Sequence, residues 1–151
     1  MRQIMIAVVL VAMAGMVGCS SKPKPTVVDA SIEAARDANP DRNGRPSPVV
    51  IYLYELESSQ EFGSADFFAL TDAGGAGAPG VLNRREFQLD PGDRMRFNEE
   101  VSPDARYLGV VAAYRDIQQA RWRHSTSLLE ATVNELEISI DQLTVSIRRP
   151  N

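Results

Sequence analysis

The chain has 151 residues with 20 acidic and 16 basic side chains, which gives a formal net charge of −4. This mild acidity argues against a nucleic-acid-binding protein, because phosphates are bound by clustered Lys and Arg. The single His and single Cys are too few to build a zinc site, and one His removes most routes to general acid–base catalysis.

The N-terminus has the pattern of a secretory signal peptide, with Arg2 before an apolar run from Ile4 to Val17. The run is too short to span a bilayer comfortably. It ends at Met16-Val17-Gly18-Cys19, which resembles the lipobox of bacterial lipoproteins, where diacylglycerol is added to the Cys before cleavage. We therefore predict a signal peptide over 1–18 and a mature chain starting at Cys19, modified with diacylglycerol and an N-acyl chain (palmitate). The alternative is an ordinary signal peptide followed by an incidental free thiol.

Residues 1–18 contain one charged residue, Arg2, so their removal leaves 133 residues and shifts the formal net charge from −4 to −5. Because no other Cys exists to form a disulfide, the fold must be stabilised by its hydrophobic core. Ser20 and Ser21 follow Cys19. By resemblance to the sorting rules of Gram-negative lipoproteins, the absence of Asp there implies an outer-membrane protein that faces the periplasm.

Residues 19–47 are predicted to form the lipidated N-terminus and a flexible linker, because prolines and polar residues recur along them. Within this segment, Ala30 to Arg36 has the composition of one or two helical turns capped by Asp29. A flexible coil of this length has a root-mean-square span of roughly 30 Å. We therefore expect the folded domain to stand clear of the lipid surface.

The folded domain is predicted over 48–149, and its first strand over 49–56, a β-branched and aromatic run typical of a strand buried on both faces. A similar run at 107–114 is the other candidate for the centre of a sheet. Alternating residues on both sides of Pro91-Gly92 predict a hairpin between 87–89 and 95–97. A second hairpin is expected between 136–140 and 143–147, and a strand at 121–125, with Trp122 inward, is expected to pair with 107–115.

Helical spacing over Ser64 to Leu70, with Ser64 as the N-cap, predicts a short helix that leads into a Gly- and Ala-rich loop. Loops of this length are uncommon in small domains and often carry function. About seven short strands without a long amphipathic helix predict an all-β fold. The expected architecture is a two-sheet antiparallel β-sandwich with a short helix and a long loop inserted between the first two strands.

Few residues are suited to catalysis. A triad of His124, Ser125 and Asp116 would lack the Gly-rich turn that holds a nucleophilic Ser. The adjacent Glu99 and Glu100 point apart in an extended chain and cannot face one another across a substrate. The sequence therefore predicts a protein that is not an enzyme, with no metal ion, no small-molecule substrate and no cofactor other than the lipid on Cys19.

Several stretches along the mature chain together resemble the TssJ (SciN) family of type VI secretion lipoproteins. They are Cys19 in its lipobox, Asn39-Pro40-Asp41, Gly44 to Pro48, Tyr54-Glu55-Leu56, Ser64 to Phe68, Leu89 to Gly92, and Ala105 to Asp116. The resemblance implies a transthyretin-like β-sandwich that its lipid anchors in the outer membrane. It also implies binding to the periplasmic C-terminal region of the inner-membrane protein TssM and, through TssM, to TssL in the trans-envelope complex.

In this family the loop between the first and second strands takes part in binding TssM. On the strands predicted above, that loop is the Gly-rich insertion. The resemblance therefore assigns the partner contact to Asp72, Ala73, Gly74, Gly75, Ala76, Gly77, Ala78, Pro79, Gly80, Val81 and Leu82. The alternatives are a pilotin-like lipoprotein that assists a secretin and a periplasmic lipoprotein that binds a small ligand, although the interiors of the predicted strands are apolar.

Overall fold

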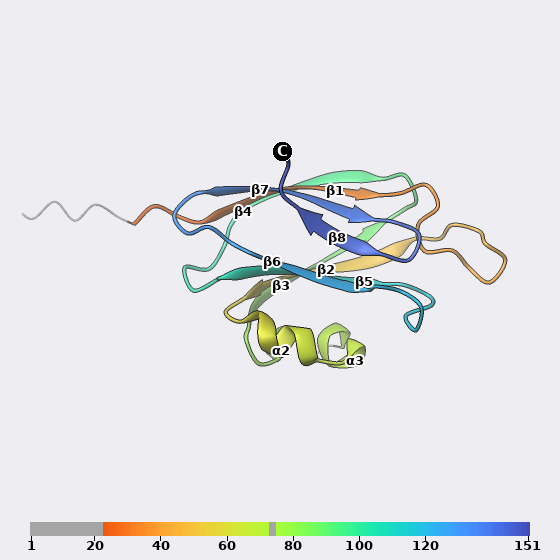
Figure 1. Cartoon of the computed structure of the whole chain (residues 1–151), viewed down its shortest axis with the longest axis horizontal. Coiled ribbons are helices and arrows are strands. Elements are labelled where there is room, and N and C mark those ends of the chain that lie inside the picture. The colour runs from red at the N-terminus through yellow and green to blue at the C-terminus, as the bar shows by residue number, and fades with distance from the viewer. Residues whose placement is uncertain (1–22, 73–74) are drawn as a thin grey trace, which may run out of the picture.

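A computed structural model describes residues 23–72 and 75–151, without the side chain of Ala76. The predicted signal peptide and Cys19 lie outside the described residues. Two four-stranded sheets face one another, and two short helices lie against the outer surface of one of them (Figure 1). The elements are β1 (Val27–Ala34), β2 (Val49–Leu56), α2 (Ser59–Ser64), α3 (Phe67–Thr71), a 3-10 turn (Gly75–Gly77), β3 (Val81–Leu89), β4 (Arg94–Glu100), β5 (Tyr107–Ala113), β6 (Arg123–Ser127), β7 (Val133–Ile140) and β8 (Val145–Arg148).

The strand order is β4-β1-β7-β8 in one sheet and β3-β2-β5-β6 in the other. All neighbouring strands are antiparallel except β1 and β7, which run parallel with Val27 opposite Val133. The predicted two-sheet β-sandwich is therefore confirmed. Among the described residues, no helix is long and apolar enough to cross a membrane.

Strand β1 corrects the predicted linker. The sequence predicts a flexible segment with helical turns here, but residues 27–34 form an inner strand between β4 and β7. Val28, Ala30, Ile32 and Ala34 are at most 1% exposed and alternate with polar positions, as on a strand with one buried face. Two of the buried residues are Ala, a good helix former, and this composition concealed the alternation. The sandwich thus begins near Thr26 and not at residue 48.

The two predicted central strands are confirmed, since β2 and β5 lie side by side in the middle of their sheet. Their apolar runs are continuous because both faces are covered. One face packs on the opposite sheet, and the other lies beneath α2 and α3. Gly109 permits this second contact, because a Cβ there would lie 2.9 Å from both Leu56 Cδ1 and Phe62 Cζ. The helix can approach the strand closely only at a residue without a side chain.

The predicted hairpin between 87–89 and 95–97 is wrong. Strand β3 pairs with β2, whereas β4 pairs with β1, so the turn after Leu89 carries the chain from one sheet to the other. Gly92 in this turn has φ +90°, and its N–H donates to Ala34 O at 2.9 Å. The alternation around Pro91-Gly92 predicted correctly which side chains are buried. It does not indicate with which strand each segment pairs. Phe87 and Phe97 consequently meet across the sandwich, with centroids 6.1 Å apart.

The other two predicted pairings are confirmed. Strands β7 and β8 form the C-terminal hairpin, and β6 pairs back onto β5. Trp122, just before β6, is only half-buried, and its ring lies edge-on to Phe67 of α3 at 5.3 Å between centroids. The Trp therefore also supports the helices.

The insertion contains two helices where one was predicted. Ser58 caps α2 by accepting from Gln60 N, and Asp66 caps α3 by accepting from Ala69 N at 3.0 Å. Ser64, the predicted N-cap, is the last residue of α2. Because β1 precedes β2, the insertion lies between the second and third strands and not between the first two.

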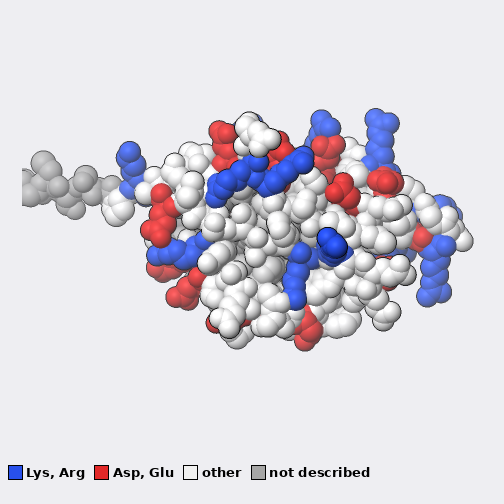
Figure 2. All heavy atoms as spheres, viewed as in Figure 1, with Lys and Arg blue, Asp and Glu red and all other residues white. Residues whose placement is uncertain are grey.

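The two ends of the sandwich carry different loops and connections. The described chain enters at one end, which also carries the connections 101–106 and 128–132 (Figure 1). The other end carries the loops 35–48, 90–93, 114–122 and 141–144. We call these the N-terminal end and the distal end. Figure 2 shows basic and acidic side chains interspersed on the face in view, without a continuous field of one sign.

Candidate functional site

The predicted partner segment, Asp72 to Leu82, is an ordered connection wherever it is described. Asp72 caps the C-terminus of α3, and Ala73 and Gly74 lie outside the described residues. Gly75 is buried against α3, where a Cβ would lie 1.8 Å from Leu70 O, so only glycine fits. Gly77 and Pro79 are exposed, and Gly80 has φ +77° just before β3.

Arg84 of β3 fixes the start of this segment. Its Nη1 donates to the carbonyl oxygens of Leu70 at 3.0 Å and Asp72 at 2.9 Å, which are C-terminal carbonyls of α3. The buried Tyr54 hydroxyl also donates to Leu70 O at 2.9 Å, and burial raises the pKa of Tyr54 to about 12. The base of the segment is therefore rigid.

This region offers a partner little besides apolar contact. Phe68 of α3 is 61% exposed, whereas its neighbour Phe67 packs on Trp122. Leu82 is 38% exposed. Both side chains could be covered by a partner, but the Gly- and Ala-rich residues between them present few groups that could make a specific contact.

The loop between the observed first and second strands is 35–48, at the distal end. Asn39 organises it from a buried position with φ +51°, a conformation that Asn adopts more readily than most residues. Its Nδ2 donates to Pro48 O at 2.6 Å, and its Oδ1 accepts from the backbone N of Arg115 at 2.7 Å. Its own backbone N–H donates to Gln142 O at 3.1 Å. One side chain thus joins this loop to the end of β5, and its backbone joins the β7–β8 turn.

Asp41 closes the tip of the same loop. Its Oδ1 accepts from the backbone N–H groups of Asn43 at 2.8 Å and Arg45 at 2.9 Å, and Oδ2 accepts from Arg45 Nε at 2.7 Å. Gly44 supplies the left-handed residue of the turn, with φ +75°. The backbone N–H of Arg45, followed by its guanidinium, lowers the pKa of Asp41 to about 2. The loop is therefore held by a charged turn, unlike the flexible linker that the sequence predicted.

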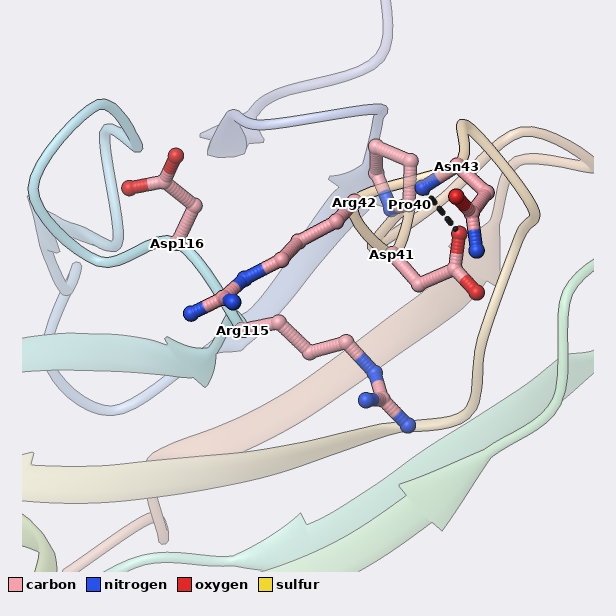
Figure 3. Close-up of a pocket in the computed structure, with 6 residues that line it drawn as sticks. All are labelled: Pro40, Asp41, Arg42, Asn43, Arg115 and Asp116. Atoms are coloured by element: carbon pink, nitrogen blue, oxygen red, sulfur yellow. Dashed lines mark hydrogen bonds between the residues drawn. The ribbon is translucent and has the colours of Figure 1, made fainter.

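A hollow of about 690 Å³ opens beside this loop (Figure 3). It is lined by Pro40, Asp41, Arg42, Asn43, Arg115 and Asp116. In Figure 3, Arg42 extends toward Asp116, whereas the Arg115 side chain extends the other way. The hollow thus lies between loop 35–48 and the end of β5.

Arg42 and Arg115 are both exposed and carry charge that a partner can use. Within residues 23–72 and 75–151, neither forms an ion pair with a carboxylate, whereas Arg45, Arg85, Arg94, Arg96, Arg106 and Arg148 each do. A guanidinium binds a carboxylate with two parallel hydrogen bonds. The distal hollow is therefore suited to an acidic or carbonyl-rich protein segment. Sequence reasoning missed this pair because its members are 73 positions apart.

The hypothetical triad is not assembled for catalysis. His124 Nδ1 accepts the backbone N–H of Ile147 at 2.8 Å and so links the edges of β6 and β8. Asp116 Oδ1 accepts from Gln119 N at 3.3 Å in its own turn. Among the described residues, no group of three or more His, Cys, Asp or Glu is placed to hold a metal ion.

Comparison with known proteins identifies the family. A family model described as "Type VI secretion lipoprotein, VasD, EvfM, TssJ" matches residues 26–143. The chain belongs to this family. The family is a structural lipoprotein component of the type VI secretion complex and not an enzyme, in agreement with the sequence prediction. No curated protein sequence matches.

Solved structures of the family agree with the fold. The type VI secretion lipoprotein TssJ1 from Pseudomonas aeruginosa is 34% identical with a TM-score of 0.79, and the match covers 84% of this chain and 98% of that one. Serratia marcescens Lip, a membrane-bound component of the type VI secretion system, is 28% identical with a TM-score of 0.74, over 84% and 99%. A chain of a structure described as "Type VI membrane complex" is 22% identical with a TM-score of 0.70, over 84% and 99%, which shows the shared fold alone.

Proposed function

We propose that this type VI secretion lipoprotein anchors the trans-envelope complex to the outer membrane. Acylated Cys19 holds the N-terminal end at the periplasmic surface of that membrane. The distal end binds the periplasmic C-terminal region of TssM and, through it, connects to TssL. The observation that carries the proposal is the rigid loop 35–48, with its free arginines, at the end of the sandwich opposite the point where the chain enters.

The presence of strand β1 changes which loop is assigned to the TssM contact. The family resemblance implies a TssM contact at the loop between the first and second strands, and the observed first strand is β1. The corresponding loop is therefore 35–48 and not the insertion ending in Asp72 to Leu82. An eight-residue strand such as β1 spans about 26 Å, so loop 35–48 lies about this far from the end of the sandwich that the lipid holds.

The contacts within the loop support this role. Asn39 and Asp41 hold it in one conformation before any partner binds, so little conformational entropy is lost on binding. Arg42 and Arg115 then supply charges that are not already neutralised. The segment Asp72 to Leu82, with Phe68 beside it, is a second candidate contact along the side of the sandwich, of apolar character.

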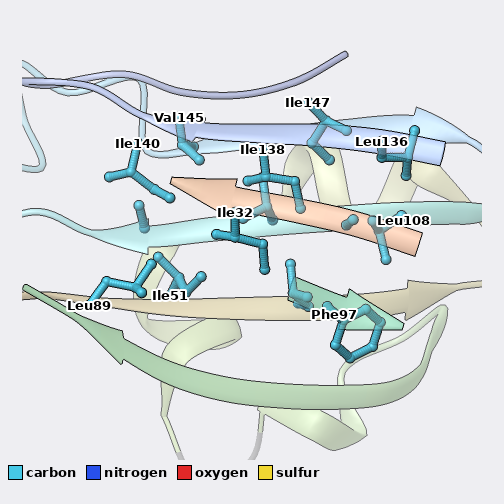
Figure 4. Packing of buried hydrophobic residues seen from close by; sticks show 14 of the residues in the cluster. Ile32, Ile51, Leu89, Phe97, Leu108, Leu136, Ile138, Ile140, Val145 and Ile147 are labelled. Atoms are coloured by element: carbon cyan, nitrogen blue, oxygen red, sulfur yellow. The ribbon is translucent and has the colours of Figure 1, made fainter. Parts of the chain in front are cut away.

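The interior gives no support to the ligand-binding alternative. In the described part of the chain, side chains of both sheets fill the space between them, among them Ile32, Ile51, Leu108 and Ile138 (Figure 4). Nothing observed favours the pilotin-like alternative either, and membership of the family argues for the secretion complex.

The anchor is tested in the host cell with Cys19→Ser, using Ser21→Ala as the matched control. We expect the Cys19→Ser protein to leave the membrane fraction and type VI secretion to stop, while Ser21→Ala behaves as the wild type. Secretion at wild-type levels by Cys19→Ser, at an equal amount of protein, would contradict the proposal.

A further inference from the structure

We infer that the N-terminal end of the sandwich rests directly on the lipid surface through Leu129 and Val133. This inference rests on the proposed acylation of Cys19 but concerns a different surface from the TssM contact. It assigns the two ends of the domain to two partners, a membrane at one end and a protein at the other.

The chain enters the sandwich at a fixed point. Thr26 Oγ1 accepts from Ala131 N at 3.0 Å, and Thr26 O accepts from Val101 N at 3.0 Å. The next residue, Val27, donates its N–H to Thr132 O at 3.0 Å. The entry point is therefore bound to the connection 128–132 and moves with it.

The tether to the lipid is short. Only six residues, Ser20 to Pro25, separate Cys19 from Thr26. Seven Cα–Cα steps span at most about 25 Å when fully extended and roughly 15 Å as a flexible coil. The N-terminal end of an acylated molecule therefore stays within this distance of the bilayer, in contrast to the roughly 30 Å expected of a long linker.

Two exposed apolar side chains flank this entry point. Leu129 is 58% exposed and Val133 is 52% exposed, and they are two of the four exposed large hydrophobic residues in residues 23–72 and 75–151. Val133 lies opposite Val27 in the parallel pair of β1 and β7. The other two, Phe68 and Leu82, belong to the helical side of the molecule.

The connection that presents Leu129 is rigid. The fully buried Asn134 accepts from Leu129 N at 2.8 Å and donates to Leu129 O at 2.9 Å. Ala131 follows in the left-handed region with φ +55°. The carboxylate of Glu130, next to Leu129, is paired with Arg106 at 3.1 Å and is therefore partly neutralised.

The partner that best fits Leu129 and Val133 is the surface of a bilayer. The tether holds the patch at a high effective concentration next to lipid, so that a contact too weak to recruit a soluble protein still forms. Insertion of Leu and Val to the level of the headgroups gains hydrophobic free energy without a charged partner. The contact would fix the direction in which loop 35–48 points.

The inference is tested with the full-length acylated protein in phosphatidylcholine vesicles that contain brominated lipid. A polarity-sensitive fluorophore is attached at Thr132→Cys or, at the distal end, at Asn43→Cys; both positions are exposed, and the thiol of Cys19 is blocked by its lipid. We expect strong quenching at 132 and little at 43. Leu129→Asn with Val133→Asn should reduce the quenching at 132 by ~3-fold or more.

The matched control is Phe68→Asn with Leu82→Asn, which removes the other exposed apolar pair and should leave the quenching at 132 unchanged. Circular dichroism confirms that each variant is folded. Equal quenching at 132 and 43, or quenching insensitive to Leu129→Asn with Val133→Asn, would overturn the inference.

Failure of the anchor itself is recognised separately. A protein without acyl chains by mass spectrometry, which does not float with the vesicles, overturns both the proposed anchor and this inference. A protein that is acylated and floats but is not quenched at 132 overturns only the orientation.

Discussion

The side-chain oxygen of Asn39 accepts the backbone N–H of Arg115 at 2.7 Å, across 76 positions of sequence. The same side chain donates to Pro48 O. These two bonds place Arg42 and Arg115 on opposite sides of one hollow (Figure 3). The arrangement of the distal end therefore depends on one buried amide.

Replacing Asn39 by Ala should lower the free energy of unfolding by about 1–3 kcal/mol, because both bonds are lost and the partly buried N–H of Arg115 and C=O of Pro48 are left without these partners. Part of the effect comes from φ +51°, which Ala tolerates poorly. Asn39→Gly, which accepts this φ, should therefore lose about 1 kcal/mol less. Chemical denaturation measures both.

The exposed Asn43 of the same loop is the control, since only its backbone N–H is bonded to Asp41. Asn43→Ala should change the stability by less than about 0.5 kcal/mol. Equal stability of Asn39→Ala and Asn43→Ala would contradict the role given to Asn39.

Gly109→Ala should destabilise the protein by about 1–3 kcal/mol, because its Cβ would lie 2.9 Å from the buried Leu56 and Phe62 side chains. Gly63 within α2 is the matched control, since a Cβ there has nothing within 4 Å. Gly63→Ala should stabilise by up to about 1 kcal/mol through helix propensity. Thermal unfolding that ranks the two variants in the opposite order would show that α2 does not pack on β5 as described.

The charged turn at Asp41 should respond to acid. Since its pKa is lowered from 3.8 to about 2, the carboxylate contributes stability that is fully present above about pH 4 and is lost as the pH falls through about 2. Carboxyl-carbon NMR titration should show the low pKa of Asp41 directly. Arg45→Ala should raise it toward 3.8, whereas Arg42→Ala should leave it low. An ordinary pKa in the wild type would mean that the turn does not form in solution.

The corrected domain boundary can be tested by truncation. A chain beginning at residue 24 keeps β1 and should unfold cooperatively. A chain beginning at residue 48 lacks the strand that joins β4 to β7 and should not fold, because Val28, Ala30 and Ile32 no longer complete the core. A cooperative transition for the shorter chain, followed by circular dichroism, would restore the linker interpretation.

The sandwich could be predicted from the sequence, but its strand pairing could be predicted only in part. The runs at 49–56 and 107–114 are apolar on both faces, and this identified the two central strands correctly. The alternation around Pro91-Gly92 reports burial alone, and burial does not distinguish a hairpin from a crossing between sheets. For β1, two buried Ala residues and neighbouring prolines resembled a linker, and this single error moved the predicted loop between the first two strands from 35–48 to the insertion.

The candidate site was harder to predict for a related reason. Arg42 and Arg115 come together only through the hydrogen bonds of Asn39, and no spacing in the sequence indicates a contact across 73 positions. Asp41 and Gly44 have the local signature of a turn, yet the same residues are typical of linkers. Tertiary contacts distinguish an ordered turn from a flexible linker, and local sequence patterns do not reveal them.

We propose that loop 35–48 at the distal end binds TssM. The most direct measurement is calorimetric titration of residues 20–151 with the periplasmic C-terminal region of the TssM encoded in the same genome. We expect saturable binding that Arg42→Ala with Arg115→Ala weakens by ~10-fold or more, while Arg148→Ala, on an arginine that pairs with Glu137 in the middle of β7, has no effect. Binding that survives the double substitution but is lost when Ala73 to Gly80 is shortened would contradict the claim and return the contact to the insertion.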